Sequence, residues 1–273
     1  MGFGKYHEDI VSRYVNDTRD REPSLGSPVP PQEIKSKPEA KQGMKQMTGL
    51  KQFQMSSARP LPVIVLADVS GSMGADGKIE ALNAALKEMI KTFSTESRLR
   101  AEIQVSLITF GGAQAATHLP LTPAHEVSNI TPLVAAGGTP LGSALETVME
   151  MLENKEIIPS RAYRPVLVLV SDGLPTDDWK QAFLRLTDSE RAKKASRLAM
   201  AIGSDADEEM LQSFTQDVEA PLFKAHNARD IFRFFRAVTM SVTTKSQSPN
   251  PDQSAVFVID DLPEGDFLKG LDC

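Results

Sequence analysis

The sequence predicts an α/β protein whose mostly parallel sheet is doubly wound, with helices on both faces and one antiparallel strand at an edge. Short apolar runs rich in Val, Ile and Leu recur along the chain, as strands buried on both faces require. These runs alternate with segments whose apolar residues fall at helical spacing. Strands that alternate with helices pair in parallel, because each crossover helix returns the chain to the same end of the sheet.

The predicted elements follow one another closely along the middle of the chain. An apolar run over 63–67 forms the first strand and ends at Asp68. Apolar residues from Ile79 to Phe93 trace one face of a long helix. The later elements are strands at 103–110 and 115–121, a helix at 141–152, strands at 165–170 and 199–203, a helix at 207–216, a strand at 221–224 and a helix at 228–242. The strand at 115–121 follows a glycine pair and is predicted to be the antiparallel edge strand.

Composition divides the chain into an N-terminal extension at 1–59, a main domain at 60–243, and a C-terminal linker with an acidic tail at 244–273. The extension combines a predicted short amphipathic helix over 7–18 with a Pro-, Lys- and Gln-rich tether. A tether and an extension that only packs on the domain are both open interpretations. In the tail, an apolar run over 255–259 is compatible with a strand, and the residues after it are acidic.

The composition also excludes several classes of protein. The chain of 273 residues is 41% hydrophobic and 24% charged, which is ordinary for a soluble globular protein. It has no apolar run of about 18 residues and no secretory signal, so neither a membrane-spanning helix nor secretion is expected. The only cysteine, Cys273, cannot form an intrachain disulfide, which favours a reducing, cytoplasmic location.

The net charge of −6 is unevenly distributed along the chain. Residues 1–60 hold 10 basic and 7 acidic residues, a net charge of +3. The remainder holds 20 basic and 29 acidic residues, a net charge of −9. A protein that binds nucleic acid needs a basic surface to neutralise phosphates. The acidic main domain therefore argues against nucleic acid as its partner.

Oxygen-bearing side chains stand at three positions where predicted strands end or helices begin. Asp68, Ser70 and Ser72 follow the first strand at alternate positions. Thr139 precedes a helix, and Asp172 follows the fourth principal strand. In a doubly wound sheet, loops at the carboxyl ends of the strands meet at one edge, so these side chains are expected to converge. Two carboxylates and three hydroxyls suit a hard cation such as Mg²⁺, or Mn²⁺ or Ca²⁺, with water or a partner's carboxylate completing the coordination.

The pattern Asp-x-Ser-x-Ser at 68–72, followed at a distance by Thr139 and Asp172, resembles the metal-ion-dependent adhesion site of von Willebrand factor A domains. The resemblance covers about residues 60–243 and implies a Rossmann-like fold for them. Within that superfamily the motifs look like the bacterial TerY-like branch. That branch is associated with tellurite resistance and with gene neighbourhoods that encode a protein kinase and a PP2C-type phosphatase.

The resemblance also implies a role for each of these side chains. Ser70, Ser72 and Thr139 would bind the metal directly, and Asp68 and Asp172 would bind it directly or through water. A Glu or Asp of a protein partner would take the open position. The expected function is therefore a non-enzymatic interaction module in a bacterial stress-response or defence complex with a kinase and a phosphatase. The rim around the partner is expected to include Met73, Gly138, Pro140, Asp177 and Trp179.

Each motif taken singly has an ordinary structural interpretation. Asp68 and the serines after it could cap a helix. Thr139 before a proline is a favourable N-cap, and Asp-Gly at 172–173 is a common turn pair. Trp179 is equally suited to the core. The combination of all the motifs in the expected order is what favours a metal site.

Two other functions remain open from the sequence. A metal-chelatase-like assembly would use the domain as a subunit beside an ATPase, which would have to be a separate protein. A metal-dependent phosphohydrolase would use Asp68 as its nucleophile. Such enzymes need a second Asp two residues later, where this chain has Ser70, and no clear motif places a lysine to hold a phosphate.

The terminal segments suggest two further hypotheses. The acidic tail could supply a carboxylate to the metal of its own or a neighbouring molecule, which would make it an internal plug or a link for self-association. A solvated tail is the alternative. In the N-terminal extension, Thr18, Ser24 and Ser27 are candidate phosphorylation sites for a partner kinase.

Overall fold

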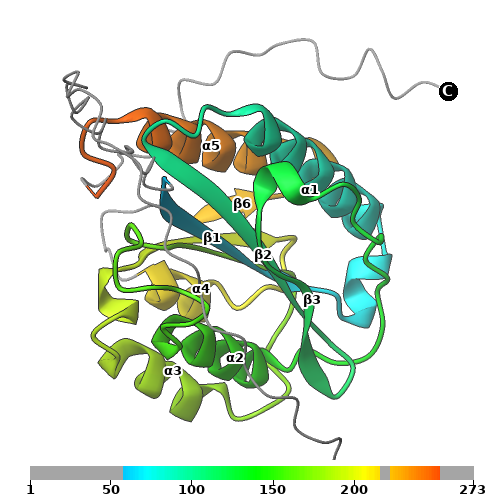
Figure 1. Cartoon of the computed structure of the whole chain (residues 1–273). Coiled ribbons are helices and arrows are strands. Elements are labelled where there is room, and N and C mark those ends of the chain that lie inside the picture. The colour runs from blue at the N-terminus through cyan, green and yellow to red at the C-terminus, as the bar shows by residue number, and fades with distance from the viewer. Residues whose placement is uncertain (1–57, 216–221, 253–273) are drawn as a thin grey trace, which may run out of the picture. The chain divides into compact units, whose positions relative to one another are not determined.

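The computed structural model describes residues 58–215 and 222–252, which form an α/β domain around a six-stranded sheet (Figure 1). The strands are β1 (Arg59–Asp68), β2 (Ala101–Gly111), β3 (Gln114–Pro123), β4 (Val166–Ser171), β5 (Ser196–Ile202) and β6 (Phe223–Ala225). Their order in the sheet is β3-β2-β1-β4-β5-β6, and only β3 is antiparallel to its neighbour. The predicted fold class is confirmed, including the antiparallel strand at one edge.

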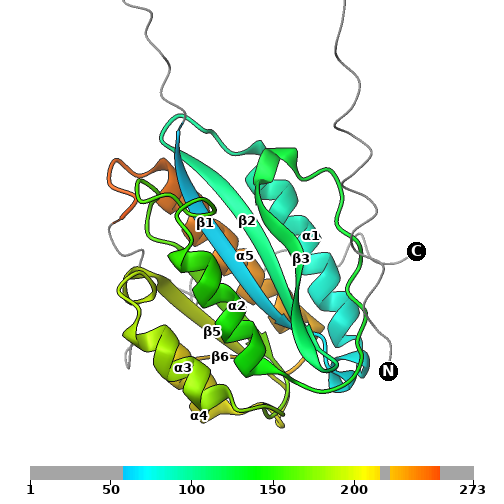
Figure 2. The same cartoon turned by 60° about the horizontal axis from the view of Figure 1, so that its bottom comes forward.

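Helices cover both faces of the sheet (Figures 1 and 2). They are α1 (Lys78–Thr95), α2 (Leu141–Glu153), α3 (Trp179–Asp188), α4 (Glu208–Thr215) and α5 (Ala228–Gln247), with short 3-10 turns η2 (Gly71–Gly74), η3 (Ala124–Glu126) and η4 (Ala192–Lys194). The apolar residues of α1 and α5 form one core cluster with the sheet, and those of α2, α3 and α4 form a second. No helix in the described ranges is both long and apolar enough to cross a membrane.

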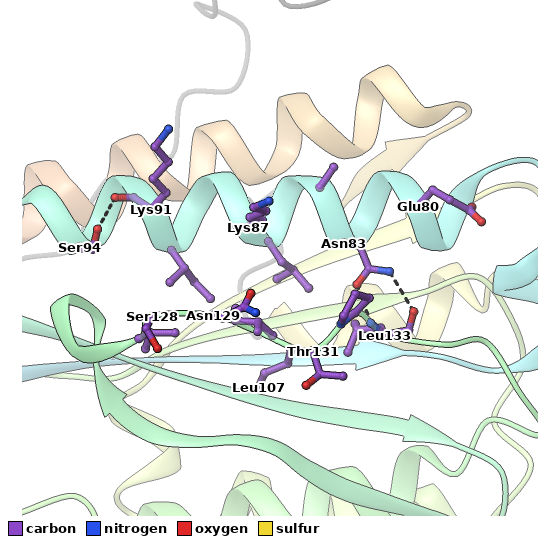
Figure 3. Close-up of a pocket in the computed structure, with 16 residues that line it drawn as sticks. Glu80, Asn83, Lys87, Lys91, Ser94, Leu107, Ser128, Asn129, Thr131 and Leu133 are labelled. Carbon is purple, nitrogen blue, oxygen red and sulfur yellow. Dashed lines mark hydrogen bonds between the residues drawn. The ribbon is translucent and has the colours of Figure 1, made fainter. Parts of the chain in front are cut away.

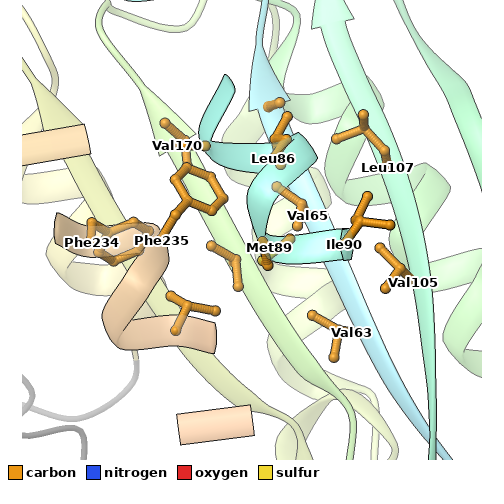
Figure 4. Packing of buried hydrophobic residues seen from close by; sticks show 14 of the residues in the cluster. Val63, Val65, Leu86, Met89, Ile90, Val105, Leu107, Val170, Phe234 and Phe235 are labelled. Carbon is orange, nitrogen blue, oxygen red and sulfur yellow. The ribbon is translucent and has the colours of Figure 1, made fainter. Parts of the chain in front are cut away.

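The continuous apolar run of β1 follows from its place in the middle of the sheet. Successive side chains of a strand point to opposite faces. Val63 and Val65 therefore pack with α1 and α5, whereas Ile64 and Leu66 pack with α2. Figure 4 shows the first of these layers, with Phe235 of α5 beside the side chains of α1 and the sheet. A strand with helices on both faces cannot alternate apolar and polar residues, and this is why the run is apolar throughout.

The register of the central strands brings their carboxyl ends level with one another. Asp68, the last residue of β1, pairs with Phe110 of β2. On the other side, Ala67 pairs with Val170 of β4, so the residues that follow β4 lie beside Asp68. The loops after β1 and β4 therefore leave the sheet side by side.

Two elements differ from the sequence-based expectation. Helix α3 was not predicted, although Trp179 and Phe183 pack against the second core cluster beside buried Ala182 and Leu186. Helix α5 continues to Gln247, through residues whose composition predicted a linker. Lys245 is buried there and its Nζ donates to the Arg164 carbonyl at 3.3 Å. Tertiary contacts therefore extend the helix beyond its local sequence signal.

Several predictions fall outside the described residues. They are the helix at 7–18, the candidate phosphorylation sites Thr18, Ser24 and Ser27, the strand at 255–259 and the acidic tail. These remain predictions.

Candidate metal site

Asp68 is buried at the end of β1, with both of its carboxylate oxygens engaged. The Ser70 amide donates to Oδ1 at 2.8 Å, and the Ser171 hydroxyl donates to Oδ2 at 2.6 Å. Burial raises the pKa of Asp68, as does the nearby charge of Asp172, while the hydrogen bonds from Ser171 and Ser70 lower it. Ser171 was not among the predicted site residues. The sequence feature that could have identified Ser171 is its position at the end of a central strand, directly before Asp172.

A chain of hydroxyl groups connects the β1 loop to the β4 loop. The hydroxyl oxygens of Ser70 and Ser72 lie 2.9 Å apart. The Ser72 hydroxyl donates to Asp172 Oδ1 at 2.8 Å. Ser70 and Asp172 are buried whereas Ser72 between them is exposed, so this group of oxygens reaches the surface at Ser72. Four of the five predicted ligands are thus in a single connected group.

The loop that carries Thr139 is joined to the β1 loop through the backbone. The Ala136 amide donates to the Val69 carbonyl at 2.7 Å, and the Gly71 amide donates to the Gly137 carbonyl at 2.9 Å. Gly137 has a φ of 73°, and a Cβ there would lie 2.3 Å from the Cα of Gly112. No other residue fits this close approach of two backbones. The glycines of this loop therefore hold Thr139 at the same sheet edge.

Buried Thr139 is the fifth predicted ligand. Its backbone exchanges two hydrogen bonds with Thr176, one from the Thr139 amide to Thr176 Oγ1 at 3.0 Å and one from the Thr176 amide to the Thr139 carbonyl at 2.9 Å. A methyl group built on Gly173 would lie 3.7 Å from Thr139 Oγ1 and 3.9 Å from Ser72 Oγ. Both hydroxyls therefore lie around Gly173, next to Asp172.

Lys78, which the sequence did not single out, forms an ion pair within this site. Its Nζ lies 2.7 Å from Asp172 Oδ2, and the Asp172 side chain is fully buried. Lys78 is the first residue of α1. A cation is unfavourable beside the positive end of a helix unless a carboxylate compensates. A lysine at the start of a predicted helix is therefore the sequence feature that could have indicated this ion pair. Together, the carboxylates of Asp68 and Asp172 and the ammonium group of Lys78 carry a formal charge of −1, whereas the two carboxylates alone carry −2.

The donor set of the site fits a hard divalent cation. All five predicted ligands offer oxygen atoms, and the site keeps a negative formal charge. Within the described part of the chain, no group of three or more His, Cys, Asp or Glu side chains could hold a metal. The candidate ligands of this site are therefore two carboxylates and three hydroxyls.

The predicted rim is only partly at the surface. Met73 is fully buried among the apolar residues beneath α1, and Pro140 is buried as well, so placing either on the rim was wrong. Both occupy the first turn after a site loop, and such turns pack inward onto the sheet. Gly138 is half-buried. Trp179 is half-buried too, with its ring centroid 5.9 Å from that of Phe183.

Two exposed apolar side chains stand in the site loops instead. Leu174 is 65% exposed and follows Gly173 directly. Val134 is 76% exposed in the loop that leads to Thr139. Neither was predicted, because an isolated apolar residue in a loop gives no sequence signal for exposure.

Asp177, another predicted rim residue, caps α2. Its Oδ1 and Oδ2 accept from the amides of Gly142 and Ser143, each at 2.9 Å. We expect Asp177→Ala to lower the free energy of unfolding by about 1–2 kcal/mol, because two amides at the helix N-terminus lose their acceptor. Urea unfolding monitored by circular dichroism measures this. The neighbouring Asp178 is exposed and makes no side-chain capping bond, so Asp178→Ala is the matched control. Equal stabilities of the two variants would contradict the capping role.

The chain resembles known proteins in part of its sequence and in its fold. Residues 63–174 match the family model of the von Willebrand factor type A domain. The chain is similar to the structure of proximal thread matrix protein 1 from the mussel byssus, with 17% identity and a TM-score of 0.53 over 67% of this chain and 48% of that one. Another structure of that protein is described as having a zinc-occupied metal-ion-dependent adhesion site (16% identity, TM-score 0.50, 67% and 45% coverage).

Two further structures share the fold. A von Willebrand factor type A protein from Catenulispora acidiphila is 19% identical, with a TM-score of 0.51 over 67% of this chain and 43% of that one. The pilus adhesin SpaC from Lactobacillus rhamnosus GG is 14% identical, with a TM-score of 0.56 over 69% and 31%. The chain thus spans less than half the length of each of these structures. No curated protein matches it. Residues 63–174 thus match the von Willebrand factor type A family model, and these solved structures share the fold of the described domain.

Proposed function

We propose that this domain binds a divalent cation and uses it to capture an acidic residue of a protein partner. The observation that carries the proposal is the convergence of five oxygen-bearing side chains from three loops on one sheet edge. Ser70 and Ser72 are 2.9 Å apart, and Ser72 donates to Asp172 at 2.8 Å. The zinc named for the mussel protein's adhesion site supports the same kind of site here.

Different residues of the chain would bind the cation and contact the partner. Asp68, Ser70, Ser72, Thr139 and Asp172 would hold the cation. A bound cation would supply a positive charge that accepts a carboxylate from outside. Because Asp68 is fully buried and Ser72 is exposed, a partner's carboxylate would approach the cation from the side of Ser72. The exposed Leu174 would lie against the partner, where burial of an apolar side chain adds affinity.

The finer assignments rest on chemistry and resemblance. An all-oxygen set favours Mg²⁺, with Mn²⁺ or Ca²⁺ as alternatives. We propose a bacterial, cytoplasmic, TerY-like role in a stress response linked to tellurite resistance, with a protein kinase and a PP2C-type phosphatase as partners. A subunit role beside a separate, chelatase-like ATPase is the alternative.

A phosphohydrolase is less well supported. Lys78 does supply the lysine that the sequence motifs lacked, at 2.7 Å from Asp172. However, a nucleophilic Asp68 must be reached by the phosphorus atom of a bulky substrate, and Asp68 is fully buried. Ser70 also cannot replace the acid that protonates a leaving group.

The proposed function is tested by partner binding with and without Mg²⁺. The purified chain is assayed by surface plasmon resonance against the proposed partners, a protein kinase and a PP2C-type phosphatase of the TerY-like gene neighbourhoods. We expect Mg²⁺-dependent binding that Asp68→Ala abolishes and that Leu174→Ser weakens about tenfold at unchanged Mg²⁺ affinity. Leu99→Ser is the matched control, since Leu99 is 91% exposed in the loop between α1 and β2, away from the site loops. Binding that is unaffected by chelation of the metal would refute the proposal.

A further inference from the structure

A groove runs along α1 on the side facing away from α5 (Figure 3). Its volume is about 610 Å³. One wall is α1, the other is the loop at 127–133, and Leu107 of β2 lies at its base. Leu86 and Ile90 give the helix wall an apolar surface, while Lys87 and Lys91 are exposed beside them. The groove thus combines an apolar interior with charged side chains of net charge +1, since Glu80 lines it as well as Lys87 and Lys91.

Hydrogen bonds hold the loop wall of the groove in place. Asn83 of α1 donates to the Leu133 carbonyl at 2.9 Å and accepts from the Leu133 amide at 2.7 Å. On the other side, His118 Nε2 lies 2.8 Å from the Thr131 carbonyl, which ties the loop to β3. A groove whose wall is held in place in this way is suited to receive an extended segment of chain.

We propose that the C-terminal segment 255–266 of this same chain docks in the groove along α1. The segment consists of an apolar run, Ala255 to Ile259, followed by the acidic residues Asp260, Asp261, Glu264 and Asp266. The apolar run matches the interior of the groove. The acidic residues match its lysines. The proposal concerns a second surface, and it does not depend on cation binding at the sheet edge.

The described chain ends close to the C-terminal end of α1. Asp252 pairs with Arg59 at 3.6 Å, and the Arg59 guanidinium stacks 3.8 Å above the Tyr163 ring. The Tyr163 hydroxyl in turn donates to the Arg100 carbonyl at 3.4 Å, in the loop that follows α1. Gln247 also donates to Glu96, just after α1, at 2.8 Å. The segment after Asp252 therefore starts at the end of the molecule where the groove begins.

The length of the segment suffices for the groove. Helix α1 has 18 residues and is about 27 Å long. Residues 253–259 would span about 23 Å if extended, and residues 253–266 about 46 Å. The apolar run can therefore lie along Ile90 and Leu86, with the acidic residues within reach of Lys87.

The net charges of the two terminal segments favour the C-terminal one as the occupant of the groove. Residues 253–273 contain five acidic residues and one lysine, a net charge of −4. Residues 1–57 contain nine basic and seven acidic residues, a net charge of +2. Both segments join the domain at the same end, because Arg59, near the start of the described chain, pairs with Asp252, its last described residue. Only the C-terminal segment is complementary to Lys87 and Lys91.

Hydrogen exchange of the full-length chain, followed by mass spectrometry, tests the docking. The readout is the exchange rate of the amides at 127–133. We expect Asp260→Lys/Asp261→Lys to make this exchange about tenfold faster, because two attractive pairs become repulsive. Lys87→Glu/Lys91→Glu should have the same effect. Combining the four changes should restore slow exchange, because the pairs are re-formed with reversed charge. A restored rate would also show that neither pair of substitutions by itself had disrupted the fold.

Lys155→Glu/Lys194→Glu is the matched control, since both lysines are exposed, Lys155 in the turn after α2 and Lys194 in η4, and the apolar residues of both regions pack on the opposite sheet face. It should leave exchange at 127–133 unchanged. Equal exchange in wild type and in Asp260→Lys/Asp261→Lys would overturn the proposal. Protection that falls when the protein is diluted would also overturn it, because the segment would then come from a second molecule.

Discussion

Asp68→Asn is expected to reduce the affinity of the domain for Mg²⁺ by about 100-fold or more, because it removes one of only two carboxylates in the site. The fold should survive the change. An asparagine has the same shape, its side-chain oxygen can still accept from the Ser70 amide, and Ser171 can reverse its hydroxyl to accept from the new NH₂ group. Loss of binding would therefore report on the metal site and not on unfolding.

Isothermal titration with Mg²⁺ measures this effect directly, and thermal unfolding provides a second readout. A cation at 100 times its Kd stabilises the wild type by about 2.7 kcal/mol, and this gain should disappear in Asp68→Asn. Asp178→Asn is the control, since Asp178 is an exposed carboxylate beside the site with no side-chain capping bond. Equal Mg²⁺ affinities of Asp68→Asn and wild type would exclude Asp68 as a ligand.

Lys78→Met is expected to change stability and metal affinity in opposite directions. Without metal, the buried carboxylate of Asp172 loses its ion-pair partner, which should lower the free energy of unfolding by about 3 kcal/mol. With the lysine removed, the formal charge of the site changes from −1 to −2. Mg²⁺ should therefore bind about tenfold more tightly, a gain of about 1.4 kcal/mol.

Urea unfolding with and without Mg²⁺ measures both effects in one series. Lys155→Met is the control, because Lys155 is exposed in the turn that follows α2 and belongs to neither proposed site. It should alter neither quantity. If Lys78→Met binds Mg²⁺ no more tightly than the wild type, the lysine does not weaken the site, and its role is confined to stabilising the metal-free domain.

The sequence predicted the architecture because its signals are local. The run over 63–67 is apolar throughout since both faces of β1 are covered, and the fold bears this out. The sequence-based prediction missed α3, although Trp179 and Phe183 pack on the core beside Ala182 and Leu186, and it ended α5 too early, where composition predicted a linker. In both places, contacts with distant parts of the chain decide the structure.

For the site, the sequence by itself determined which oxygen-bearing side chains stand at strand ends, because a parallel sheet collects those ends at one edge. Only the tertiary structure decided which other groups meet them. Ser171 and Lys78 contact Asp68 and Asp172 across about a hundred residues of chain. Met73 lies one residue from a predicted ligand and yet is buried. The groove along α1 likewise forms from segments that no sequence spacing connects, because side-chain direction and long-range contact arise only when the chain folds.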